Sequence, residues 1–339
     1  MDGIAALSEI AFWMERARAE TRRIEAYRKA AWALSAIPAA ELDERIAART
    51  LTEVPLVGPS TSAVVLEASS SGLPKKLAEL RARGATPLAE GGEKLRRKLK
   101  GDLHAHSNWS DGGSPIEEMV TAARSVGHDY LALTDHSPRL TVANGLTAER
   151  LADQLDVIDE INGRYGDFVL LPGIEVDILD DGKLDQSREM LERLAVVVAS
   201  IHSKLRSDAE TMTVRMVGAI ANPMTNVLGH CTGRLLEGSR GIRPESQFDA
   251  DVVFAACAKF DVAVEINSRP ERRDPPSRLI QLALEAGCLF SIDTDAHAPG
   301  QLAFQDYGCA RAVANGVPSS RIVNTWSKQR LLEWTHAKR

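Results

Sequence analysis

Six of the eight histidines in this 339-residue chain lie at the ends of short apolar segments or just beyond them, and Asp111, Glu175 and Asp295 occupy similar positions. Nitrogen and oxygen donors grouped in this way are typical of metal sites. Nine side chains make up the candidate ligand set: His104, His106, Asp111, His136, Glu175, His202, His230, Asp295 and His297. At about four to six donors for each ion, with some bridging, nine donors predict two or three divalent ions. No thiolate is in the set, so zinc, manganese and iron all fit it, and the Irving–Williams order does not decide between them.

The spacing within two short motifs favours chelation. In His104-Ala-His106, residues i and i+2 of a strand point to the same face, so both imidazoles can reach one ion. Asp295-Ala-His297 repeats this spacing towards the other end of the sequence. Glu175 is a natural bridging ligand, because its two oxygens can bind two ions.

Polar residues beside the candidate ligands supply three further candidates for catalytic roles. Asp135 precedes His136 and is either a ligand or an acceptor that holds an imidazole N–H group, and we favour the second interpretation. Arg234 and Arg269 are the candidate phosphate contacts, because each follows a predicted strand at the ligand-bearing end. The alternative for both arginines is an ordinary solvated loop charge.

Clustered divalent ions favour the hydrolysis of phosphate esters. A metal ion lowers the pKa of bound water from about 15.7 to about 7, which supplies a nucleophile near neutral pH. Two ions also stabilise the negative charge that develops on the phosphate oxygens during in-line displacement. The ligand set therefore predicts a metal-dependent hydrolase that acts on phosphate esters and needs no side-chain nucleophile.

The elements that carry these residues alternate between short apolar segments and helical stretches. Strands are predicted at 101–106, 130–134, 168–176, 195–201, 226–230, 262–267 and 289–293. Helices are predicted at 115–126, 147–164, 187–193, 208–221, 247–260, 276–286 and 303–314. Seven such alternations predict a parallel α/β barrel, in which functional residues lie at the C-terminal ends of the strands. If the barrel closes, its first and last strands bring the two spaced pairs of candidate ligands together.

The first hundred residues have a different, helical pattern. Helices are predicted at 4–19, at 22–36, at 40–48, from Gly58-Pro59 onwards, and over a basic segment at 74–100. Residues 1–100 carry 17 Lys and Arg against 13 Asp and Glu, whereas the remaining residues carry 24 against 34. The change in pattern and charge predicts two domains, 1–98 and 99–339, with different partners.

Composition excludes several classes of protein. With 44% hydrophobic and 26% charged residues, the chain has an ordinary globular composition rather than that of a disordered protein. No apolar run approaches the roughly 18 residues of a membrane helix, and the N-terminus lacks the pattern of a secretory signal. The four cysteines are widely spaced and form no CxxC pair, which predicts buried thiols and a reducing cytoplasm.

The motifs of the predicted barrel resemble those of the polymerase-and-histidinol-phosphatase (PHP) family. They are Asp102-Leu-His-Ala-His-Ser, Leu133-Thr-Asp-His-Ser, Gly173-Ile-Glu-Val-Asp, Ser200-Ile-His-Ser, Gly229-His and Ser291-Ile-Asp-Thr-Asp-Ala-His. They occur in the family's order over about residues 101–335, and they are most similar to the PHP module of bacterial family X DNA polymerases.

The resemblance implies a distorted seven-stranded (β/α)7 barrel of TIM-like type with a trinuclear metal centre. It assigns the first ion to His104, His106, Glu175 and Asp295. It assigns the second ion to Glu175, His202 and His230. It assigns the third ion to Asp111, His136 and His297.

The helical front resembles the N-terminal domain of the same polymerases. Residues 54–65 resemble a helix–hairpin–helix turn, whose backbone N–H groups bind a DNA phosphate, although the usual first glycine of the hairpin is Leu56 here. Residues 23–31 resemble the first helices of that domain. The alternative is a small helical bundle that only packs on the barrel. About 40 residues separate the hairpin from His104, too few for a polymerase palm, which is therefore predicted to be absent.

The predicted function is hydrolysis of phosphate esters by metal-activated water at a trinuclear site, with DNA or nucleotide 3′ ends as substrates. Two alternatives remain open. One is a small-molecule phosphatase of the histidinol-phosphate type, and the other is a DNA-binding accessory protein with structural metals. The predicted partners are a phosphate ester and, through residues 1–98, DNA, with no membrane.

Overall fold

A computed structural model describes residues 2–238 and 241–338. The chain forms two compact units, which we call the helical unit (Met1–Pro87 with Pro299–Gln301) and the barrel unit (Leu88–Ala298 with Leu302–Arg339). None of the described helices is long and apolar enough to cross a membrane. The domain boundary between residues 98 and 99 stays a prediction.

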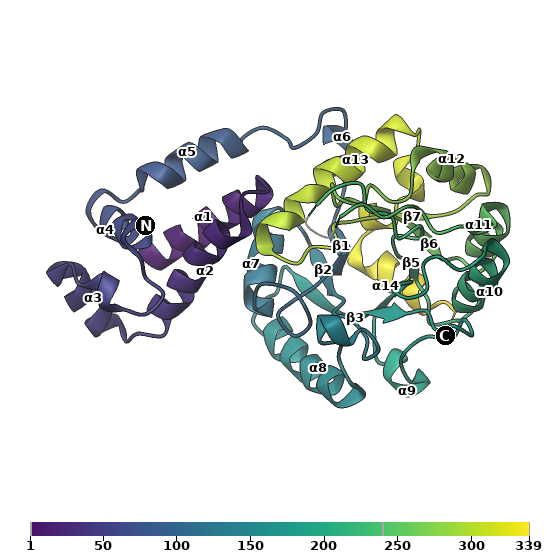
Figure 1. The fold of residues 1–339 in the computed structure, drawn as a ribbon, viewed down its shortest axis with the longest axis horizontal. Coiled ribbons are helices and arrows are strands. Elements are labelled where there is room, and N and C mark those ends of the chain that lie inside the picture. Colours follow the sequence, from purple (N-terminus) through teal and green to yellow (C-terminus); the bar gives the residue numbers. More distant parts are fainter. Residues whose placement is uncertain (1, 239–240, 339) are drawn as a thin grey trace. The chain divides into compact units, whose positions relative to one another are not determined.

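All seven predicted strands are present in the barrel unit, and they pair in parallel in chain order. They are β1 (Gly101–Ala105), β2 (Tyr130–Leu133), β3 (Val169–Asp177), β4 (Val196–Ser200), β5 (Val227–Leu228), β6 (Ala263–Asn267) and β7 (Phe290–Asp293), as Figure 1 shows. The last residue of β1, Ala105, pairs in parallel with Ala296, which lies just after β7. The predicted seven-stranded α/β barrel is therefore confirmed.

Helices join consecutive strands and lie outside the barrel (Figure 1). They are α7 (Ile116–Ser125), α8 (Ala148–Asn162), α9 (Arg188–Leu191), α10 (Ala209–Ile220), α11 (Ala250–Lys259) and α12 (Ser277–Glu285). The short α6 (Glu93–Arg96) precedes β1, and α13 (Gln305–Ala314) and α14 (Lys328–His336) follow β7. Short 3₁₀ helices lie at Thr141–Ala143, Pro299–Phe304, Ser319–Arg321 and Val323–Thr325.

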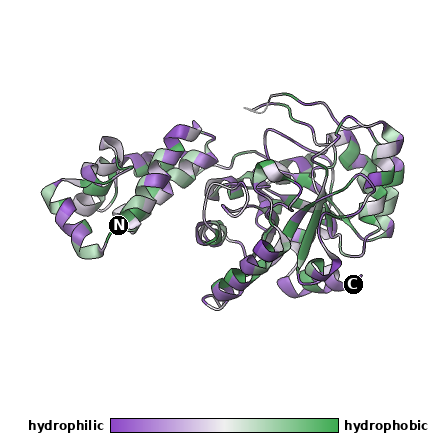
Figure 2. Ribbon diagram, turned by 60° about the horizontal axis from the view of Figure 1, so that its bottom comes forward, coloured by the Kyte–Doolittle hydropathy of each residue, from purple (hydrophilic) through white to green (hydrophobic). Residues whose placement is uncertain are grey.

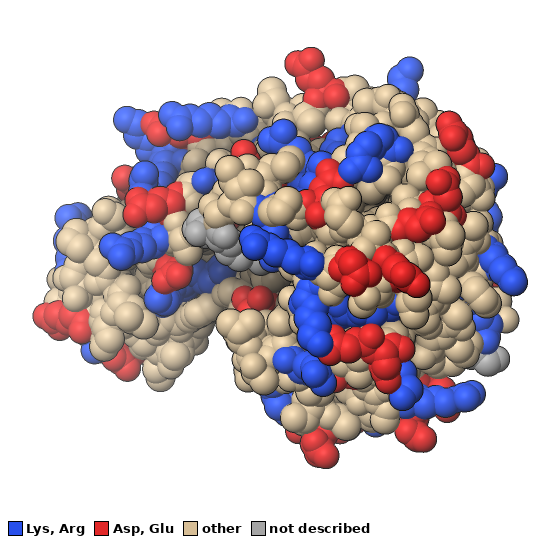
Figure 3. All heavy atoms as spheres, turned by 45° about the vertical axis from the view of Figure 1, so that its right-hand side comes forward, with Lys and Arg blue, Asp and Glu red and all other residues tan. Residues whose placement is uncertain are grey.

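Burial on both faces explains why the sequences of the strands are continuous apolar runs. Every residue of β4, Val-Val-Val-Ala-Ser, is buried, because the barrel interior covers one face and the helices cover the other. Figure 2 shows the same arrangement as hydrophobic strands surrounded by helices that carry hydrophilic residues. Charged side chains of both signs are interspersed on the face seen in Figure 3, so surface charge alone does not mark a site there.

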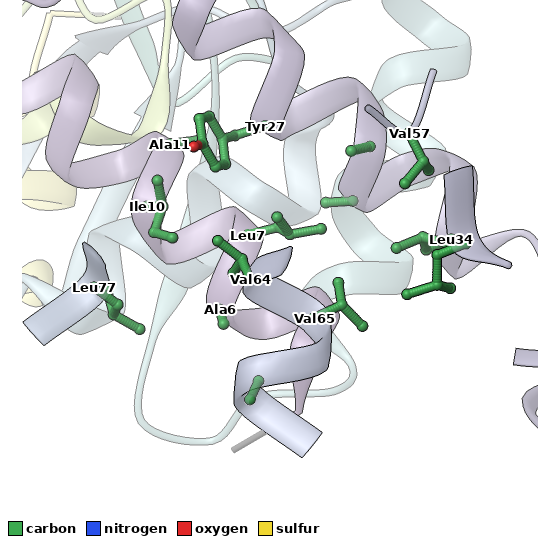
Figure 4. Close-up of a cluster of buried hydrophobic side chains, with 14 of the residues drawn as sticks. Ala6, Leu7, Ile10, Ala11, Tyr27, Leu34, Val57, Val64, Val65 and Leu77 are labelled. Carbon is green, nitrogen blue, oxygen red and sulfur yellow. The ribbon is translucent and has the colours of Figure 1, made fainter. Parts of the chain in front are cut away.

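The helical unit has a hydrophobic core of its own. It contains α1 (Gly3–Arg16), α2 (Thr21–Ser35), α3 (Ala39–Ala48), a 3₁₀ turn (Leu51–Glu53), α4 (Pro59–Ser71) and α5 (Lys75–Gly84). Figure 4 shows Leu7 and Ile10 of α1 pointing towards side chains of the other helices, with Leu34, Val64 and Leu77 in the same cluster. The helices predicted at 4–19, 22–36 and 40–48 are present, each within a few residues of its predicted ends.

The predicted continuous helix at 74–100 is wrong. Helix α5 ends at Gly84, and the short α6 begins only at Glu93. Pro87 has no backbone N–H to donate and disfavours helical geometry in the preceding residue. Gly91 then adopts a positive φ of 88°, which a right-handed helix does not contain. These residues break the helix between the two units.

The turn before α4 contains a left-handed residue at the position where the hairpin glycine was expected. Leu56 adopts a φ of 69°, the left-handed conformation that glycine enters most easily, and its side chain is 65% exposed. Two residues later, Gly58 N–H donates to Thr61 Oγ1 at 3.0 Å, and α4 begins at Pro59. The resemblance of this turn to a helix–hairpin–helix turn stays a prediction.

Candidate metal centre

The candidate ligands gather at one end of the barrel, because parallel strands direct their C-terminal ends to the same side. His104 and Glu175 lie within β1 and β3, near the ends of these strands. The other seven lie in the segments that follow strands: His106, Asp111, His136, His202, His230, Asp295 and His297.

Glu175 lies at the centre of this group, and only 1% of its surface is exposed. Its Oε2 is 3.2 Å from His104 Nε2, 3.5 Å from His106 Nε2 and 3.0 Å from His136 Nδ1. Its Oε1 is 3.3 Å from His202 Nε2 and 2.8 Å from His230 Nε2. Each carboxylate oxygen thus faces a different set of imidazoles, which is the arrangement that a bridging ligand needs.

A more open corner of the centre is formed around Asp111. Its Oδ1 lies 3.4 Å from His136 Nε2 and 3.3 Å from His297 Nε2. The side chains of Asp111 and His297 are 36% and 19% exposed, whereas those of His104 and Glu175 are buried. This corner is therefore the most solvent-exposed part of the centre.

The remaining candidate carboxylate, Asp295, joins the two regions. Its Oδ1 is 3.4 Å from His106 Nε2, and its backbone has a φ of 51°, in the left-handed region that aspartate tolerates better than most residues. His106 also belongs to a second set of donors, whose ligand atoms all lie within 4.8 Å of one another. This set is His106, Asp111, His136 and His297. The structure brings all nine candidates together, with His106 and His136 each shared between sets of donors.

The residues present fit divalent cations. His104 Nε2, His106 Nε2, His230 Nε2 and both oxygens of Glu175 are buried and have no hydrogen-bond partner. Buried polar atoms without partners are rare and costly. Here they point at one another over distances that suit joint coordination of a cation, and their donor types match zinc, manganese or iron.

The electrostatics of the centre also favour positive charge. Burial alone would lower the pKa of His104, but the carboxylates of Glu175 and Glu265 outweigh it and raise that pKa well above the usual range. In the same way, burial is outweighed by Glu175 and Asp177 at His202, whose pKa rises to about 9. A raised imidazole pKa marks a place where neighbouring carboxylates stabilise a cation.

Two other histidines are held neutral, as metal ligands must be. Burial, together with the neighbouring His297 and His136, lowers the pKa of His106 to about 3. Burial and the nearby Arg272 lower the pKa of His230 to about 3.

Two carboxylates that the sequence analysis did not assign lie behind the candidate ligands. Glu265 Oε1 is 2.6 Å from His104 Nδ1, and its Oε2 accepts from the backbone N–H of His230 at 2.5 Å. Asp177 Oδ1 is hydrogen-bonded to His202 Nδ1. The available signals were a glutamate in the middle of an apolar strand and an aspartate two residues after Glu175.

Asp135 has other partners than expected. It accepts hydrogen bonds from Ser107 (N–H at 2.8 Å, Oγ at 2.6 Å), from Ser110 Oγ at 2.5 Å and from Gln154 Nε2 at 2.7 Å. No imidazole is among the hydrogen-bond partners of Asp135 in the described residues. Burial raises the pKa of Asp135, and these four donors oppose that effect. Its observed contacts hold the loop between His106 and Asp111.

The two arginines singled out in the sequence differ in their surroundings. Arg269 Nη1 donates to the Asp295 carbonyl at 3.1 Å and lies 2.9 Å from His297 Nδ1, inside the centre. Arg234 directs its guanidinium to the main-chain carbonyls of Arg272 and Arg273, so it braces the loop after β6. Their roles as phosphate contacts stay predictions.

Arg272 is a further cationic residue at the centre that the sequence analysis missed. Only 4% of its surface is exposed, and its Nε donates to Asp295 Oδ2 at 3.1 Å. Its Nη1 is buried and has no hydrogen-bond partner. The signal was its place in the basic segment Arg269-Pro-Glu-Arg272-Arg273, directly after β6.

Comparison with known proteins identifies the fold family of this barrel. Residues 102–269 match the PHP domain. Residues 102–269 are a PHP domain. The expected family is thus confirmed, and the match begins and ends within the barrel unit.

Relatives of this PHP domain include both a polymerase and phosphatases. The chain is 38% identical over 230 residues to the DNA polymerase/3′-5′ exonuclease PolX of Bacillus subtilis, covering 68% of this chain but 40% of that protein. It is 28% identical over 211 residues to a probable phosphatase of Thermoanaerobacter sp., covering 59% of this chain and 80% of the relative. The probable phosphatase YcdX of Escherichia coli is 27% identical over 256 residues, covering 70% and 94%.

Two solved structures also match. One carries the name putative histidinol phosphatase and comes from Listeria monocytogenes, with 18% identity, a TM-score of 0.46 and coverage of 60% of this chain and 97% of that one. The other is histidinol phosphate phosphatase of Lactococcus lactis with zinc, L-histidinol and phosphate, with 15% identity, a TM-score of 0.43 and coverage of 71% and 92%. The family match and the relatives agree with the predicted enzyme class, a metal-dependent hydrolase of phosphate esters.

Proposed function

We propose that this chain hydrolyses phosphate esters at a trinuclear metal centre formed by the nine candidate ligands. The observation that carries the proposal is the position of Glu175, whose two oxygens lie within 3.5 Å of nitrogens from five histidines. A buried carboxylate with so many imidazole neighbours and no hydrogen-bond partner is suited to bridging cations.

The grouping of ligands follows the resemblance, with additions from the geometry. His104, His106, Glu175 and Asp295 would hold one ion, Glu175 with His202 and His230 a second, and Asp111, His136 and His297 a third. His106 lies near enough to Asp111, His136 and His297 to take part in that set as well. Zinc, manganese and iron remain the candidate metals.

The chemistry divides between the ions and the chain. Bound divalent ions supply Lewis acidity and the activation of water near neutral pH. The chain's own residues orient the phosphate: Arg269 lies beside Asp295 and His297, and the buried N–H group of Arg272 offers a donor. Asp135 holds the loop that carries Asp111, and Arg234 holds the loop that carries Arg272. The exposed corner at Asp111 is where a substrate would enter.

A panel of substrates and metals tests this proposal. Purified protein is freed of metal with a chelator and reloaded separately with Mn²⁺, Zn²⁺ or Fe²⁺. Hydrolysis of a phosphomonoester and a phosphodiester model compound is then measured for the wild type and for His104→Ala. We expect that added metal restores hydrolysis by the wild type but not by His104→Ala. Hydrolysis of neither compound with any of the three metals would overturn the proposal.

DNA or nucleotide 3′ ends are the substrates we propose first. The support is the hairpin geometry at Leu56 and the similarity to a polymerase whose name includes 3′-5′ exonuclease. Residues 1–98 would bind the DNA backbone through N–H groups at the start of α4. Small phosphomonoesters of the histidinol-phosphate type are the second candidate, supported by the similarity to probable phosphatases along most of their length. Faster turnover of histidinol phosphate than of oligonucleotides would favour that candidate.

A charge placed in the hairpin tests the DNA contact in the full chain. Ser60 is exposed in the first turn of α4, so Ser60→Asp keeps the helix stable but repels a phosphate at its N-terminus. We expect DNA affinity to fall several-fold, whereas Ser70→Asp, at the other end of α4, adds the same charge with little effect. Equal affinity of the two variants would exclude this contact.

The accessory alternative is tested by the same DNA-binding measurement. If the metals were structural and the protein only bound DNA, His104→Ala and Asp295→Asn would leave salt-sensitive DNA binding and the biological function intact. Loss of hydrolysis in these variants, with DNA binding retained, supports the enzyme.

A further inference from the structure

His104 and His202 each have Glu175 at one ring nitrogen and, at the other, a carboxylate from outside the candidate ligand set. His104 Nε2 faces Glu175 Oε2 at 3.2 Å, while its Nδ1 faces Glu265 Oε1 at 2.6 Å. His202 Nε2 faces Glu175 Oε1 at 3.3 Å, while its Nδ1 is hydrogen-bonded to Asp177 Oδ1. Both rings therefore direct the same nitrogen at the same bridging carboxylate.

The outer carboxylates are themselves fixed in place. Glu265 is buried, and its second oxygen accepts from the backbone N–H of His230 and from Asn267 Nδ2 at 3.2 Å. Asp177 is 4% exposed, and its backbone N–H donates to Ser137 Oγ at 2.9 Å. Glu265 cannot turn away from His104 without losing these hydrogen bonds, and burial restricts the side chain of Asp177 beside His202.

Hydrogen bonds to Nδ1 decide which nitrogen of an imidazole is free for a metal. A carboxylate acceptor keeps the proton on Nδ1, so Nε2 presents its lone pair to the ion. The reverse arrangement, in which a protonated carboxyl group donates to Nδ1, would keep the proton on Nε2 and block coordination there. His106 Nδ1 and His230 Nδ1, by contrast, are buried without a hydrogen bond.

We propose that Glu265 and Asp177 are positioning residues that hold His104 and His202 as Nε2 ligands and strengthen metal binding at the two sides of Glu175. Neither residue belongs to the proposed ligand set, and neither touches the substrate in this role. The inference rests on the proposed metal centre and adds to it the residues that orient two of its ligands.

Two conservative variants test the inference in the full chain. Glu265→Gln and Asp177→Asn keep the size and one acceptor oxygen but remove the charge. We expect each to lower the affinity for Zn²⁺ by about 10-fold or more, measured by competition with a chromophoric chelator. Circular dichroism and thermal unfolding of each variant establish that it is folded before its affinity is compared with that of the wild type.

A spectroscopic readout separates positioning from general structural damage. In the Zn²⁺-loaded wild type, the two Nδ1–H protons should give low-field, exchange-protected NMR signals, because charged acceptors form strong hydrogen bonds. Each variant should move one signal upfield and leave the other in place. Asp274→Asn is the matched control, since it removes a buried carboxylate bonded to Thr232 and should move neither signal.

The outcomes distinguish this inference from the proposed function. If the wild type fails to bind Zn²⁺, the metal centre itself is excluded. If the wild type binds Zn²⁺ but both variants bind it equally well, or the signals stay unchanged, Glu265 and Asp177 do not position the ligands. Signals assigned to Nε2–H in the loaded protein would also overturn the inference.

Discussion

Arg269 shows what the surroundings of a single residue add to its type. Its guanidinium contacts the Asp295 carbonyl and His297 Nδ1, whereas Arg234, chosen in the sequence on equal grounds, holds two main-chain carbonyls. Only Arg269 of this pair has its donors inside the metal centre. We therefore expect the two residues to respond differently to substitution.

Arg269→Gln should raise KM for a phosphomonoester by about 10-fold or more, because the charged donor to the phosphate is lost. The matched control is Arg139→Gln, an exposed arginine in the loop after β2, which should change KM by less than about twofold. Steady-state kinetics of the metal-loaded proteins check the difference. An unchanged KM for Arg269→Gln would remove this residue from the phosphate site.

His128 lies outside the metal centre and makes stability depend on pH. It is 4% exposed, its Nε2 lies 2.9 Å from Gln305 Oε1, and burial together with nearby Arg96 lowers its pKa to about 3. The unfolded chain takes up a proton near pH 6.5, while the folded chain does not until about pH 3. The contribution of His128 to stability is therefore complete above about pH 6.5 and is lost as the pH falls towards 3.

His128→Gln keeps a donor for Gln305 but cannot titrate. Between pH 6 and 4 the free energy of unfolding of the wild type should fall more steeply than that of the variant, by up to about 1.4 kcal/mol per pH unit. Urea unfolding at several pH values measures both slopes, and the remaining titrating groups are common to the two proteins. Parallel slopes would show that His128 is already protonated in the folded protein.

Among the elements, the hairpin at Leu56 depends on backbone conformation more than on side-chain contacts. Leu56 has a φ of 69°, a conformation that is unfavourable for leucine. Because Leu56 is 65% exposed, packing of its side chain offsets little of that cost. Leu56→Gly should change the free energy of unfolding of the helical unit by less than about 1 kcal/mol, because relief of strain offsets the greater freedom of the unfolded chain.

Leu56→Val is the informative comparison for this turn. A β-branched residue fits the left-handed region worse than leucine, so it should destabilise the helical unit by about 1–2 kcal/mol. Denaturant unfolding followed by circular dichroism measures both variants. Equal stability of the valine and glycine variants would mean that the turn does not need a positive φ.

The strands and most helices could be predicted because their signals are local. The runs that became β3 and β4 are apolar and bounded by polar residues, and the candidate ligands follow strand ends, where a barrel places its functional residues. The break after α5 was missed because basic helix formers on both sides outweighed Pro87 and Gly91 in the sequence pattern.

The partners of the ligands could not be predicted, because they come from distant segments. Glu265 meets His104 across 161 residues, and this pairing exists only once β6 and β1 face the same interior. Likewise, Arg234 finds main-chain carbonyls, which carry no signal in a sequence. Asp135 accepts from two serines and a glutamine, where an imidazole was expected, because the loop after β1 folds over it.

At the scale of the whole molecule, the two units have separate cores and different predicted ligands. If divalent ions bind the folded barrel unit as proposed, they should stabilise it by about 2.7 kcal/mol at a free concentration 100 times Kd. Differential scanning calorimetry with and without Zn²⁺ measures this effect. Zn²⁺ should raise the unfolding temperature of the barrel unit and leave that of the helical unit unchanged. A single transition that shifts as a whole would show that the units unfold together.

Glu175 offers the most direct test of the central claim, that this PHP domain is a metal-dependent phosphoesterase. Glu175→Gln keeps the shape of the bridging residue, and Glu160→Gln, an exposed residue of α8, is the control. The measurement is hydrolysis of a phosphate ester as Mn²⁺ is titrated into metal-free protein. We predict activity in the wild type and the control, and a loss of about 100-fold or more in Glu175→Gln at every metal concentration. Activity of Glu175→Gln equal to the wild type, or wild-type activity that persists without metal, would contradict this account.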